Sequence, residues 1–412
     1  MAEQEAPQAN LQDQDDIFML EDEEDDPNLF GLVIKHTLEW PSLTVQWLPP
    51  ANSNITTDHN LDGRQILLGT HTSGNNSNYL IRACVYRHQQ NIEADAIHGH
   101  SNGGPIVNVE DYKVRITQKI NHAGKVNRAR YMPQNPVIIA TKTVSGQIHV
   151  FDYTMYPSTP PISQQSSPCL RLAGHSAEGK GLAWSTSKEG YLLSGSDDAR
   201  ICLWDTANAN GSRRGILRPL QTFQAHSAGR IIRPVRDVAW HSDSDALFGS
   251  AGDDGQLLIW DHRALTGPTQ TVKVNEEGIN CLAFEPLNKE LVAVGCAEER
   301  ILVLYDLRQL SQPLHKFLTD ESTGEVYHVE WDPNCATKLA SAEEDAVKVW
   351  DLTRIDTQKP DRPHEPLVTY ADHSFRIPDL AWNEMAEGMI ASIDNENSLR
   401  IWQIGESFYN HS

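Results

Sequence analysis

Histidine, serine, aspartate and tryptophan recur together in this sequence, and histidines beside aspartates are the groups from which catalytic dyads are made. In two places the serine precedes the tryptophan by 10 positions and the aspartate precedes it by 6. The members are His175, Ser194, Asp198 and Trp204, and then His226, Ser250, Asp254 and Trp260. A set that recurs at fixed offsets is typical of a repeated structural unit whose buried polar groups satisfy one another. We therefore interpret both sets as structural and not catalytic.

Other signals of catalysis or metal binding are missing from the sequence. There is no glycine-rich phosphate loop and no nucleophile elbow. The 6 cysteines lie at least 15 positions apart, which excludes zinc-ligand spacing and a disulfide framework and favours a reducing compartment. We expect a protein that is not an enzyme, with no catalytic residue, no metal ion and no cofactor.

Aromatic residues form pairs 19 to 21 positions apart along most of the chain. The pairs are Tyr131 and Phe151, Trp184 and Trp204, Trp240 and Trp260, Phe284 and Tyr305, Trp331 and Trp350, and Trp382 and Trp402. The first member ends a short alternating strand, and the second lies in an apolar strand followed in most cases by aspartate. The segment ending at Trp47 adds a seventh opening. Short strands repeated with this period predict an all-β, seven-bladed β-propeller over residues 36–404.

Residues before the first blade are expected to close the ring and to add a helix. A propeller that stays open leaves strand edges exposed, so we expect residues 36–42 to supply the outermost strand of the last blade. Pro27, followed by apolar residues at helical spacing, predicts a helix over residues 27–35 that packs on the propeller rim. Residues 405–412 are expected to form a tail or a short C-terminal helix.

The charge is strongly acidic and unevenly distributed. The chain has 34 Lys and Arg against 56 Asp and Glu, a formal net charge of -22. Residues 1–26 contain eleven acids and no Lys or Arg, which predicts a disordered solvated arm or an arm that steers a basic ligand. Direct binding of nucleic acid is disfavoured by the sign of the charge. Without an apolar stretch of about 18 residues or a signal-peptide pattern, we expect no membrane association.

The repeated units resemble the WD-repeat family, whose blades are held by a buried set of His, Ser or Thr, Asp and Trp. By this resemblance the seventh blade keeps His373, Ser392 and Trp402 and has Glu396 in the place of the aspartate. The fifth blade is degenerate, with Gly295, Glu299 and Tyr305 at the corresponding offsets.

Longer phrases resemble one particular group of WD-repeat proteins. They are LEWPSLTVQWLP at 38–49, LLGTHTS at 67–73, INHAGKVNRARYMPQNPVIIATKT at 120–143 and ALFGS at 246–250. They are similar to the histone-binding WD-repeat proteins, the retinoblastoma-binding or chromatin assembly factor small subunit family, and this chain resembles a divergent member. The resemblance implies a nuclear, non-catalytic subunit that binds histones H4 and H3. It also implies partners in chromatin assembly, histone deacetylase, nucleosome-remodelling or Polycomb-type methyltransferase complexes, and a role in transcriptional repression.

The resemblance implies a groove for the first helix of histone H4. One wall would consist of Leu29, Phe30, Leu32 and Val33. The other wall would be the loop 356–367, with Asp361, Glu365 and Leu367. This loop departs from the family because Lys359, Arg362 and His364 dilute its acidic charge. Helix-in-groove recognition of this kind combines apolar anchors with carboxylates that bind Lys and Arg.

The resemblance also implies a peptide channel on the top face, used for basic tails such as that of histone H3. The matching positions are Glu39, His71, Asn127, Arg128, Glu178, Glu325, Tyr327, Arg376 and Asn397. Lys125, Lys180 and Arg236 stand where the family has Glu, Tyr and Glu, and Asn395 stands where it has Glu. Three added cations are expected to weaken the binding of a basic peptide.

Two interpretations remain open beside histone binding. The phrases Trp260-Asp261-His262-Arg263 and Tyr305-Asp306-Leu307-Arg308 match a WDxR pattern, so a substrate receptor of a cullin ubiquitin ligase is the alternative function. Five arginines at positions 213, 214, 218, 230 and 233 form either a solvated connection or a weak site for an acidic partner or DNA phosphate.

Overall fold

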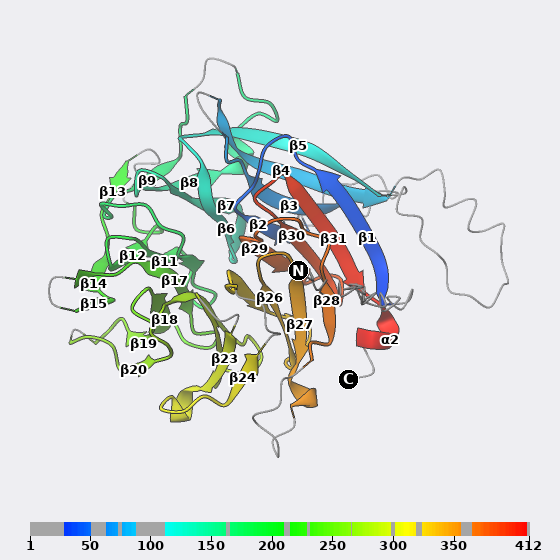
Figure 1. Ribbon diagram of the computed structural model, residues 1–412. Helices are drawn as coiled ribbons and strands as arrows, with labels where there is room; N and C mark the ends of the chain where they lie inside the picture. The colour runs from blue at the N-terminus through cyan, green and yellow to red at the C-terminus, as the bar shows by residue number, and fades with distance from the viewer. Residues whose placement is uncertain are drawn as a thin grey trace, which may run out of the picture.

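Seven antiparallel sheets radiate around a central axis in the computed structural model (Figure 1). The structure describes residues 29–50, 63–72, 76–87, 112–161, 165–209, 215–228, 231–264, 266–297, 301–318, 324–355 and 365–409. Each sheet is one propeller blade, and its strands follow one another from the axis outwards. The predicted all-β, seven-bladed propeller is therefore confirmed.

The strands of the first four blades are as follows. Blade 1 contains β2 (Val45–Leu48), β3 (Arg64–Gly69), β4 (Asn78–Arg87) and β5 (Tyr112–His122). Blade 2 contains β6 (Val126–Met132), β7 (Asn135–Thr143), β8 (Ile148–Asp152), β9 (Leu170–Leu172) and the added strand β13 (Ile216–Leu217). Blade 3 contains β10 (Leu182–Trp184), β11 (Tyr191–Gly195), β12 (Arg200–Asp205) and β14 (Gln221–Gln224). Blade 4 contains β17 (Val235–Trp240), β18 (Leu247–Gly252), β19 (Gln256–Asp261) and β20 (Gln270–Lys273).

Three blades complete the ring, and a small hairpin lies between blades 3 and 4. Blade 5 contains β21 (Ile279–Phe284), β22 (Leu291–Cys296), β23 (Ile301–Asp306) and β24 (His315–Leu318). Blade 6 contains β25 (His328–Trp331), β26 (Lys338–Ala342), β27 (Val347–Asp351) and β28 (Val368–Tyr370). Blade 7 contains β29 (Asp379–Trp382), β30 (Met389–Ile393), β31 (Ser398–Ile404) and β1 (Phe30–Thr37). The hairpin consists of β15 (Ser227–Ala228) and β16 (Ile231–Ile232).

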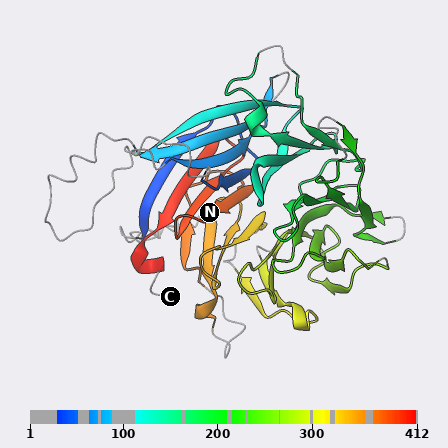
Figure 2. The ribbon, with the colours of Figure 1, turned by 180° about the vertical axis from the view of Figure 1, so that it is seen from behind.

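Strand β1 closes the ring by pairing antiparallel with β31, and both views show the two strands side by side (Figures 1 and 2). The predicted helix over residues 27–35 is therefore wrong from Phe30 onwards. The predicted closing segment, 36–42, is also misplaced, because the pairing runs from Phe30 to Thr37. Leu32 and Ile34 are buried while Lys35 is exposed, an alternation with the period of a strand. The open edge of β31 thus decides the conformation of a segment whose apolar residues also fit a helix.

A bulge in β1 divides its apolar side chains between the two faces of blade 7. The register shifts between Phe30 and Leu32, which leaves Gly31 as the extra residue. Leu32 and Ile34 therefore join the core shared by blades 7 and 1. Phe30 and Val33 pack instead against the core shared by blades 6 and 7.

The recurring polar sets form a buried hydrogen-bonded arrangement that we call the blade lock. In blade 3, Trp204 Nε1 donates to Ser194 Oγ at 2.9 Å, and His175 Nε2 lies 2.7 Å from the same oxygen. His175 Nδ1 lies 3.3 Å from Asp198 Oδ1, and Trp204 is fully buried. The lock of blade 4 is equivalent, with distances of 2.9 Å for Trp260 to Ser250, 2.9 Å for His226 to Ser250 and 2.7 Å for His226 to Asp254.

The lock of blade 7 differs from its prediction in the identity of the acid. His373 Nε2 lies 2.8 Å from Ser392 Oγ, but His373 Nδ1 lies 3.2 Å from Asp394 and not from Glu396. Asp394 also accepts backbone hydrogen bonds from Glu396 and Ser398, so it occupies the turn that Glu396 was expected to hold. Trp402 Nε1 is buried and has no hydrogen-bond partner among the described residues.

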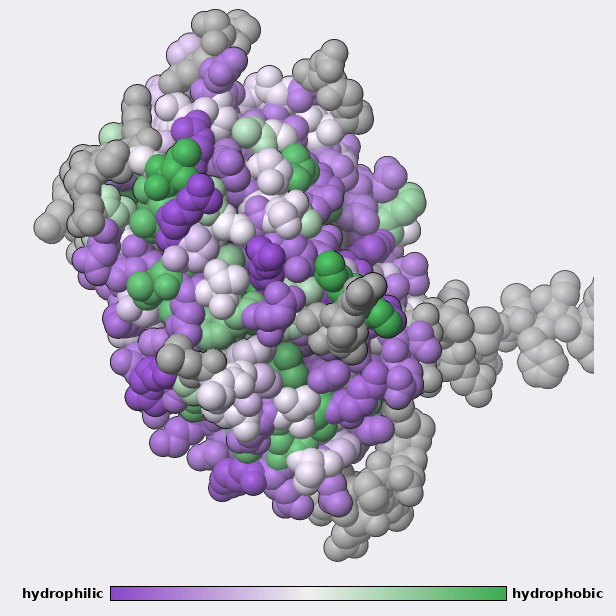
Figure 3. Space-filling view, turned by 90° about the vertical axis from the view of Figure 1, so that its left-hand side faces the viewer, coloured by the Kyte–Doolittle hydropathy of each residue, from purple (hydrophilic) through white to green (hydrophobic). Residues whose placement is uncertain are grey.

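A short helix and a mixed surface complete the fold. The predicted C-terminal helix is confirmed as α2 (Glu406–Tyr409), where Tyr409 donates a 2.7 Å hydrogen bond to Asp332 Oδ2. No helix among the described residues is both long and apolar enough to span a membrane. The face that carries β13 and β14 is largely hydrophilic, with hydrophobic residues in separate patches (Figure 3).

Candidate functional site

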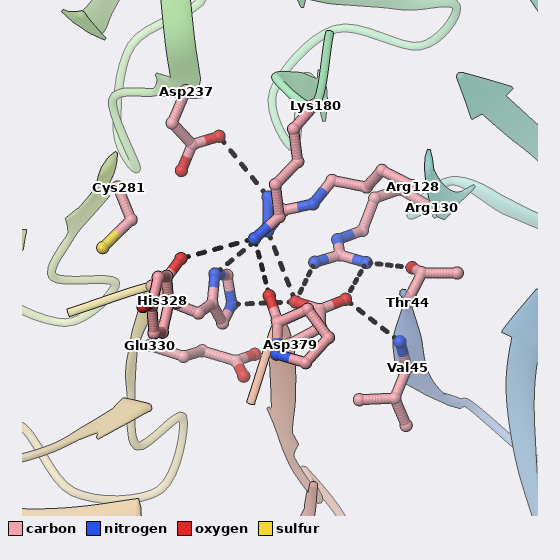
Figure 4. Close-up of polar contacts among 12 residues, drawn as sticks. Thr44, Val45, Arg128, Arg130, Lys180, Asp237, Cys281, His328, Glu330 and Asp379 are labelled. Atoms are coloured by element: carbon pink, nitrogen blue, oxygen red, sulfur yellow. Dashed lines mark hydrogen bonds and ion pairs between the residues drawn. The ribbon is translucent and has the colours of Figure 1, made fainter. Parts of the chain in front are cut away.

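A buried carboxylate, Asp379 on β29, forms the floor of the central channel (Figure 4). Its Oδ1 accepts hydrogen bonds from Arg130 at 2.9 Å and Arg128 at 3.3 Å, and its Oδ2 accepts from Arg130 at 3.0 Å and from the Val45 amide at 3.0 Å. Burial alone would raise the pKa of Asp379, but the two guanidinium groups outweigh it and hold this pKa well below its usual range. Asp379 is therefore ionised and joins blade 7 to blades 1 and 2.

Arg128 on β6 carries the network to the far side of the channel. Its guanidinium donates to Asp237 on β17 at 3.4 Å and to His328 Nδ1 on β25 at 3.0 Å. Burial lowers the pKa of His328, so the ring is neutral, and Nε2 is left to donate to Asp379 Oδ1 at 3.3 Å. Asp237 also accepts from the Leu282 amide of blade 5 at 3.3 Å. Blades 4, 5 and 6 are joined to blades 2 and 7 in this way.

Lys180, which precedes β10, connects blade 3 to the same network. Its Nζ donates to the carbonyl oxygens of Pro378 at 2.6 Å and Tyr327 at 3.3 Å, on the opposite wall of the channel (Figure 4). Burial, and then the charge of Arg128, lowers the pKa of Lys180 to about 7. With Lys180 included, polar contacts across the axis join all seven blades.

A pocket of about 270 Å³ lies above this network, and we call it the top pocket. Its lining residues are Leu43, Lys125, Asn127, Glu178, Gly179, Lys180, Asp197, Arg236, Arg376, Pro378 and Asn395. Three residues expected in the peptide channel therefore line it, namely Asn127, Glu178 and Arg376. The substituted positions Lys125, Lys180, Arg236 and Asn395 line it as well. Arg128, which was expected in the channel, is only 3% exposed and lies in the network below.

Most of the carboxylates around the top pocket are already bound to cations or amides. Glu178 accepts from Asn127 Nδ2 at 2.9 Å and lies 3.5 Å from Lys125 Nζ. The hydrogen bond from Asn127, with Lys125 nearby, lowers the pKa of Glu178. Arg236 forms a bidentate pair with Asp253, in which Nη2 lies 2.7 Å from Oδ2. The cations expected to repel a basic peptide thus also neutralise the acids that would attract it.

The remaining channel candidates lie around the top pocket, outside its lining. Tyr327 is buried, and the Arg376 guanidinium lies 3.9 Å above its ring centroid. Glu325 accepts from Asn280 Nδ2 at 2.8 Å. Asn397 adopts a left-handed conformation, with φ of 75°, in the turn between β30 and β31.

Two further candidates lie near blade 1. Glu39 is exposed and pairs with Lys119 at 2.9 Å. His71 is exposed, and burial followed by the charge of Lys125 lowers its pKa. His71 is therefore within the electrostatic range of the top pocket.

The residues expected to form the histone groove lie at the rim of blades 6 and 7. Leu29, Phe30, Val33 and Phe408 are partly buried and pack on a core that contains Leu367; we call these five residues the rim strip. Phe30 makes edge-on contacts with Tyr370 at 5.4 Å and Trp402 at 5.7 Å between ring centroids, so it is held by the blades.

The other groove candidates are divided between three locations. Leu32 is separated from the rim strip, because it is buried towards blade 1. Glu365 is exposed, two residues before Leu367. Asp361 lies outside the described residues.

Each WDxR phrase contains an exposed arginine held by its own aspartate. Arg263 forms a bidentate pair with Asp261, with distances of 2.9 and 2.7 Å, and Arg308 forms the same pair with Asp306 at 2.9 and 2.6 Å. These aspartates end the equivalent strands β19 and β23, so adjacent blades present two identical forks.

The arginine-rich connection is only partly described. Arg213, Arg214 and Arg230 lie outside the described residues. Arg218 donates to the carbonyl of Ala173, and Arg233 is exposed. In the described part of the chain, no group of three or more His, Cys, Asp or Glu side chains could hold a metal ion.

Comparisons with known proteins agree with this architecture. The family model that describes the histone-binding protein RBBP4 and its counterpart in the CAF1 complex matches residues 21–85, and the WD domain, G-beta repeat, matches residues 166–205 and 217–261. The chain is 40% identical over 390 residues to the WD-40 repeat-containing protein MSI3 of Arabidopsis thaliana, covering 93% of this chain and 88% of that protein. A chain in the crystal structure of the mitotic checkpoint complex matches with a TM-score of 0.62 and 15% identity over 98% of both chains, which reflects the fold alone.

Proposed function

The chain belongs to the family of histone-binding WD-repeat proteins that includes RBBP4 and its counterpart in the CAF1 complex, and from this family we propose that it is a non-catalytic histone-binding subunit in the nucleus. Its ligands are the first helix of histone H4 and, more weakly, the tail of histone H3. Its partners belong to chromatin assembly, deacetylase, nucleosome-remodelling or Polycomb-type complexes, in which it contributes to transcriptional repression. The proposal is carried by one observation, namely that the histone-binding family model matches residues 21–85, which include β1 and part of the rim strip.

The rim strip has the chemistry for binding an amphipathic basic helix. Leu29, Val33 and Phe408 are partly exposed apolar groups at the edge of blade 7. Glu365 and Glu406 are exposed carboxylates in the flanking segments. Apolar anchors and carboxylates together fit the apolar and basic faces of a histone helix.

Introducing charge into the rim strip is expected to weaken H4 binding. Replacing Leu29 and Phe408 together with glutamate should reduce the affinity for a peptide of the first H4 helix by about tenfold or more, because apolar anchors carry much of such an interface. Calorimetric titration of the full chain measures the effect. The matched control is the double change Ile216→Glu and Leu220→Glu, at side chains that are exposed by 65% and 55% on the opposite side of the ring. Equal losses in both variants, or unchanged affinity in a folded rim variant, would contradict the proposed site.

Binding of the H3 tail is expected to be limited by the cations of the top pocket. Replacing Lys125 and Arg236 with glutamine frees the carboxylates of Glu178 and Asp253. The variant should bind an unmodified H3-tail peptide more tightly at low salt, and the gain should shrink towards about 0.5 M salt as screening increases. Calorimetry on the wild type and the variant measures this. An affinity that is the same at every salt concentration would show that the H3 tail does not use this pocket.

The paired forks of blades 4 and 5 favour one alternative function, a substrate receptor of a cullin ubiquitin ligase. Arg263 and Arg308 each retain exposed guanidinium donors beside a fixed carboxylate. Co-purification separates the two functions, because histones are recovered in one case and a cullin adaptor in the other. Loss of the adaptor, with histones retained, in the double variant Arg263→Ala and Arg308→Ala would assign the forks to the ligase.

A further inference from the structure

Two cations in the top pocket have no carboxylate partner among the described residues. Lys180 Nζ contacts only the carbonyl oxygens of Tyr327 and Pro378 in this part of the chain. Carbonyl dipoles stabilise an ammonium less than a full negative charge does. The cost is evident in Lys180 itself, whose pKa is lowered to about 7 by burial and by Arg128, while Asp379, Asp237 and Cys281 only partly oppose the shift.

Arg376 is the second such cation. Its guanidinium lies over the Tyr327 ring at 3.9 Å, and within the described chain it makes no ion pair. Stacking uses the face of the guanidinium and leaves the N–H donors at its edge free. Arg376 is exposed, so these donors are accessible to a ligand.

The other charges of the top pocket leave it positive. Lys125 and Arg236 also line it, and each is paired, with Glu178 and Asp253 respectively. The lining contains four cationic side chains and two carboxylates, Glu178 and Asp197. Burial raises the pKa of Asp197, which reduces its tendency to carry charge. A positive pocket is an exception in a chain with a net charge of -22.

We propose that the top pocket binds a carboxylate side chain of an acidic peptide, held between the Arg376 guanidinium and the Lys180 ammonium. This inference goes beyond the proposed histone function, because it assigns to the centre of the propeller a ligand of opposite charge. Arginine forms a planar fork that matches a carboxylate, and lysine adds a point charge from below. The Asn395 amide, which is exposed in the same lining, supplies a further donor.

The test is a titration of the full chain with three synthetic peptides that differ at one central residue. The central residue is glutamate, glutamine or phosphoserine in an otherwise identical short peptide. We expect the glutamate peptide to bind at least about tenfold more tightly than the glutamine peptide, since one charge-assisted bidentate pair contributes about that much. Equal binding of these two peptides would overturn the proposal. Binding of the phosphoserine peptide alone would assign the pocket to phosphate and overturn the carboxylate assignment.

A matched pair of variants locates the binding. Arg376→Gln should remove the preference for the glutamate peptide. Arg233→Gln, which removes the same charge from an exposed arginine outside the pocket, should retain the preference. Equal effects of the two changes would show that only the overall charge matters, and the proposal would fail. Binding of the H4 peptide to the rim strip is measured separately, so failure here leaves the histone function standing.

Proton uptake gives an independent readout at Lys180. A bound carboxylate stabilises the ammonium and raises the pKa of Lys180, so binding at about pH 7.5 should take up a fraction of a proton. The binding enthalpy should then depend on the ionisation enthalpy of the buffer. Binding of the glutamate peptide without proton uptake would place it away from Lys180.

The chain's own acids require one more comparison. Six consecutive acids at 21–26 are tethered competitors for a positive pocket. The titrations are therefore repeated on a full chain in which these six residues are replaced by asparagine and glutamine. Absence of binding to the glutamate peptide in both forms of the chain would overturn the proposal.

Discussion

Replacing Asp379 with asparagine is expected to lower the free energy of unfolding by about 3–5 kcal/mol. The change removes the negative charge that Arg130 and Arg128 share, while both guanidinium groups stay buried. The loss of one partner from a buried ion pair is costly because the remaining charge has no water to solvate it. Denaturant-induced unfolding at about pH 7, followed by tryptophan fluorescence, measures the change.

A matched surface carboxylate provides the control. Asp372→Asn removes a carboxylate that pairs with Lys35 and Arg400 at 2.8 Å each, but whose side chain is 34% exposed. Pairs of this kind contribute about 1 kcal/mol or less, so this variant should stay close to the wild type. Comparable losses for the two substitutions would show that the channel network is no more important than a surface pair.

The pH dependence has a defined sign. Because the pKa of Asp379 is depressed in the folded state, its contribution to stability is complete above the unfolded-state pKa of about 4 and is lost as the pH falls below it. The difference between the wild type and Asp379→Asn should therefore narrow below about pH 5 and stay constant from about pH 6 to 8. A difference that widens on acidification would mean that Asp379 is not the ionised partner.

The blade architecture was predictable from the sequence because each unit repeats its own local chemistry. Trp204 and Trp260 stand at the same offsets from a serine and an aspartate, so their locks could be inferred without knowledge of the fold. Prediction failed where the acid moved. In blade 7 the turn places Asp394 beside His373, two positions before the expected Glu396, and a fixed offset cannot anticipate this.

The conformation of residues 30–37 depended on a partner more than 360 positions away. The apolar residues from Leu29 to Val33 fit a helical stripe when taken alone. The unpaired edge of β31 makes a strand more favourable, because it satisfies both backbones along the seam. The bulge at Gly31 then moves Phe30 to the same face as Val33, which a strict alternation would not predict.

The channel network was not predictable because its members come from seven separate blades. Arg128 and Lys180 were recognised from the sequence as channel positions. The sequence contains no spacing rule that links them to Asp237, His328 or Asp379, which are 57 or more positions away from either residue. The structure changes their interpretation, since Arg128 is used to hold the blades together and only Lys180 also faces the top pocket.

Replacing Trp204 with alanine is expected to lower the free energy of unfolding by about 3–5 kcal/mol. The side chain is fully buried in the core between blades 2 and 3, and its removal leaves both a cavity and an unpaired Ser194 hydroxyl. Thermal and denaturant unfolding measure the loss. A variant that unfolds within a few degrees of the wild type would contradict the role of the blade lock.

The contribution of the lock hydrogen bond is separated from packing by comparing two phenylalanine substitutions. Trp204 Nε1 donates to Ser194 at 2.9 Å, whereas Trp402 Nε1, at the equivalent place in blade 7, has no partner among the described residues. Both indole rings are fully buried, so Trp204→Phe and Trp402→Phe remove a similar volume. Only the first change breaks a hydrogen bond, so it should cost about 1 kcal/mol more than the second. If the two substitutions cost the same, the stability of a blade comes from the packing of the aromatic ring, and the polar set serves only to satisfy groups that the fold buries.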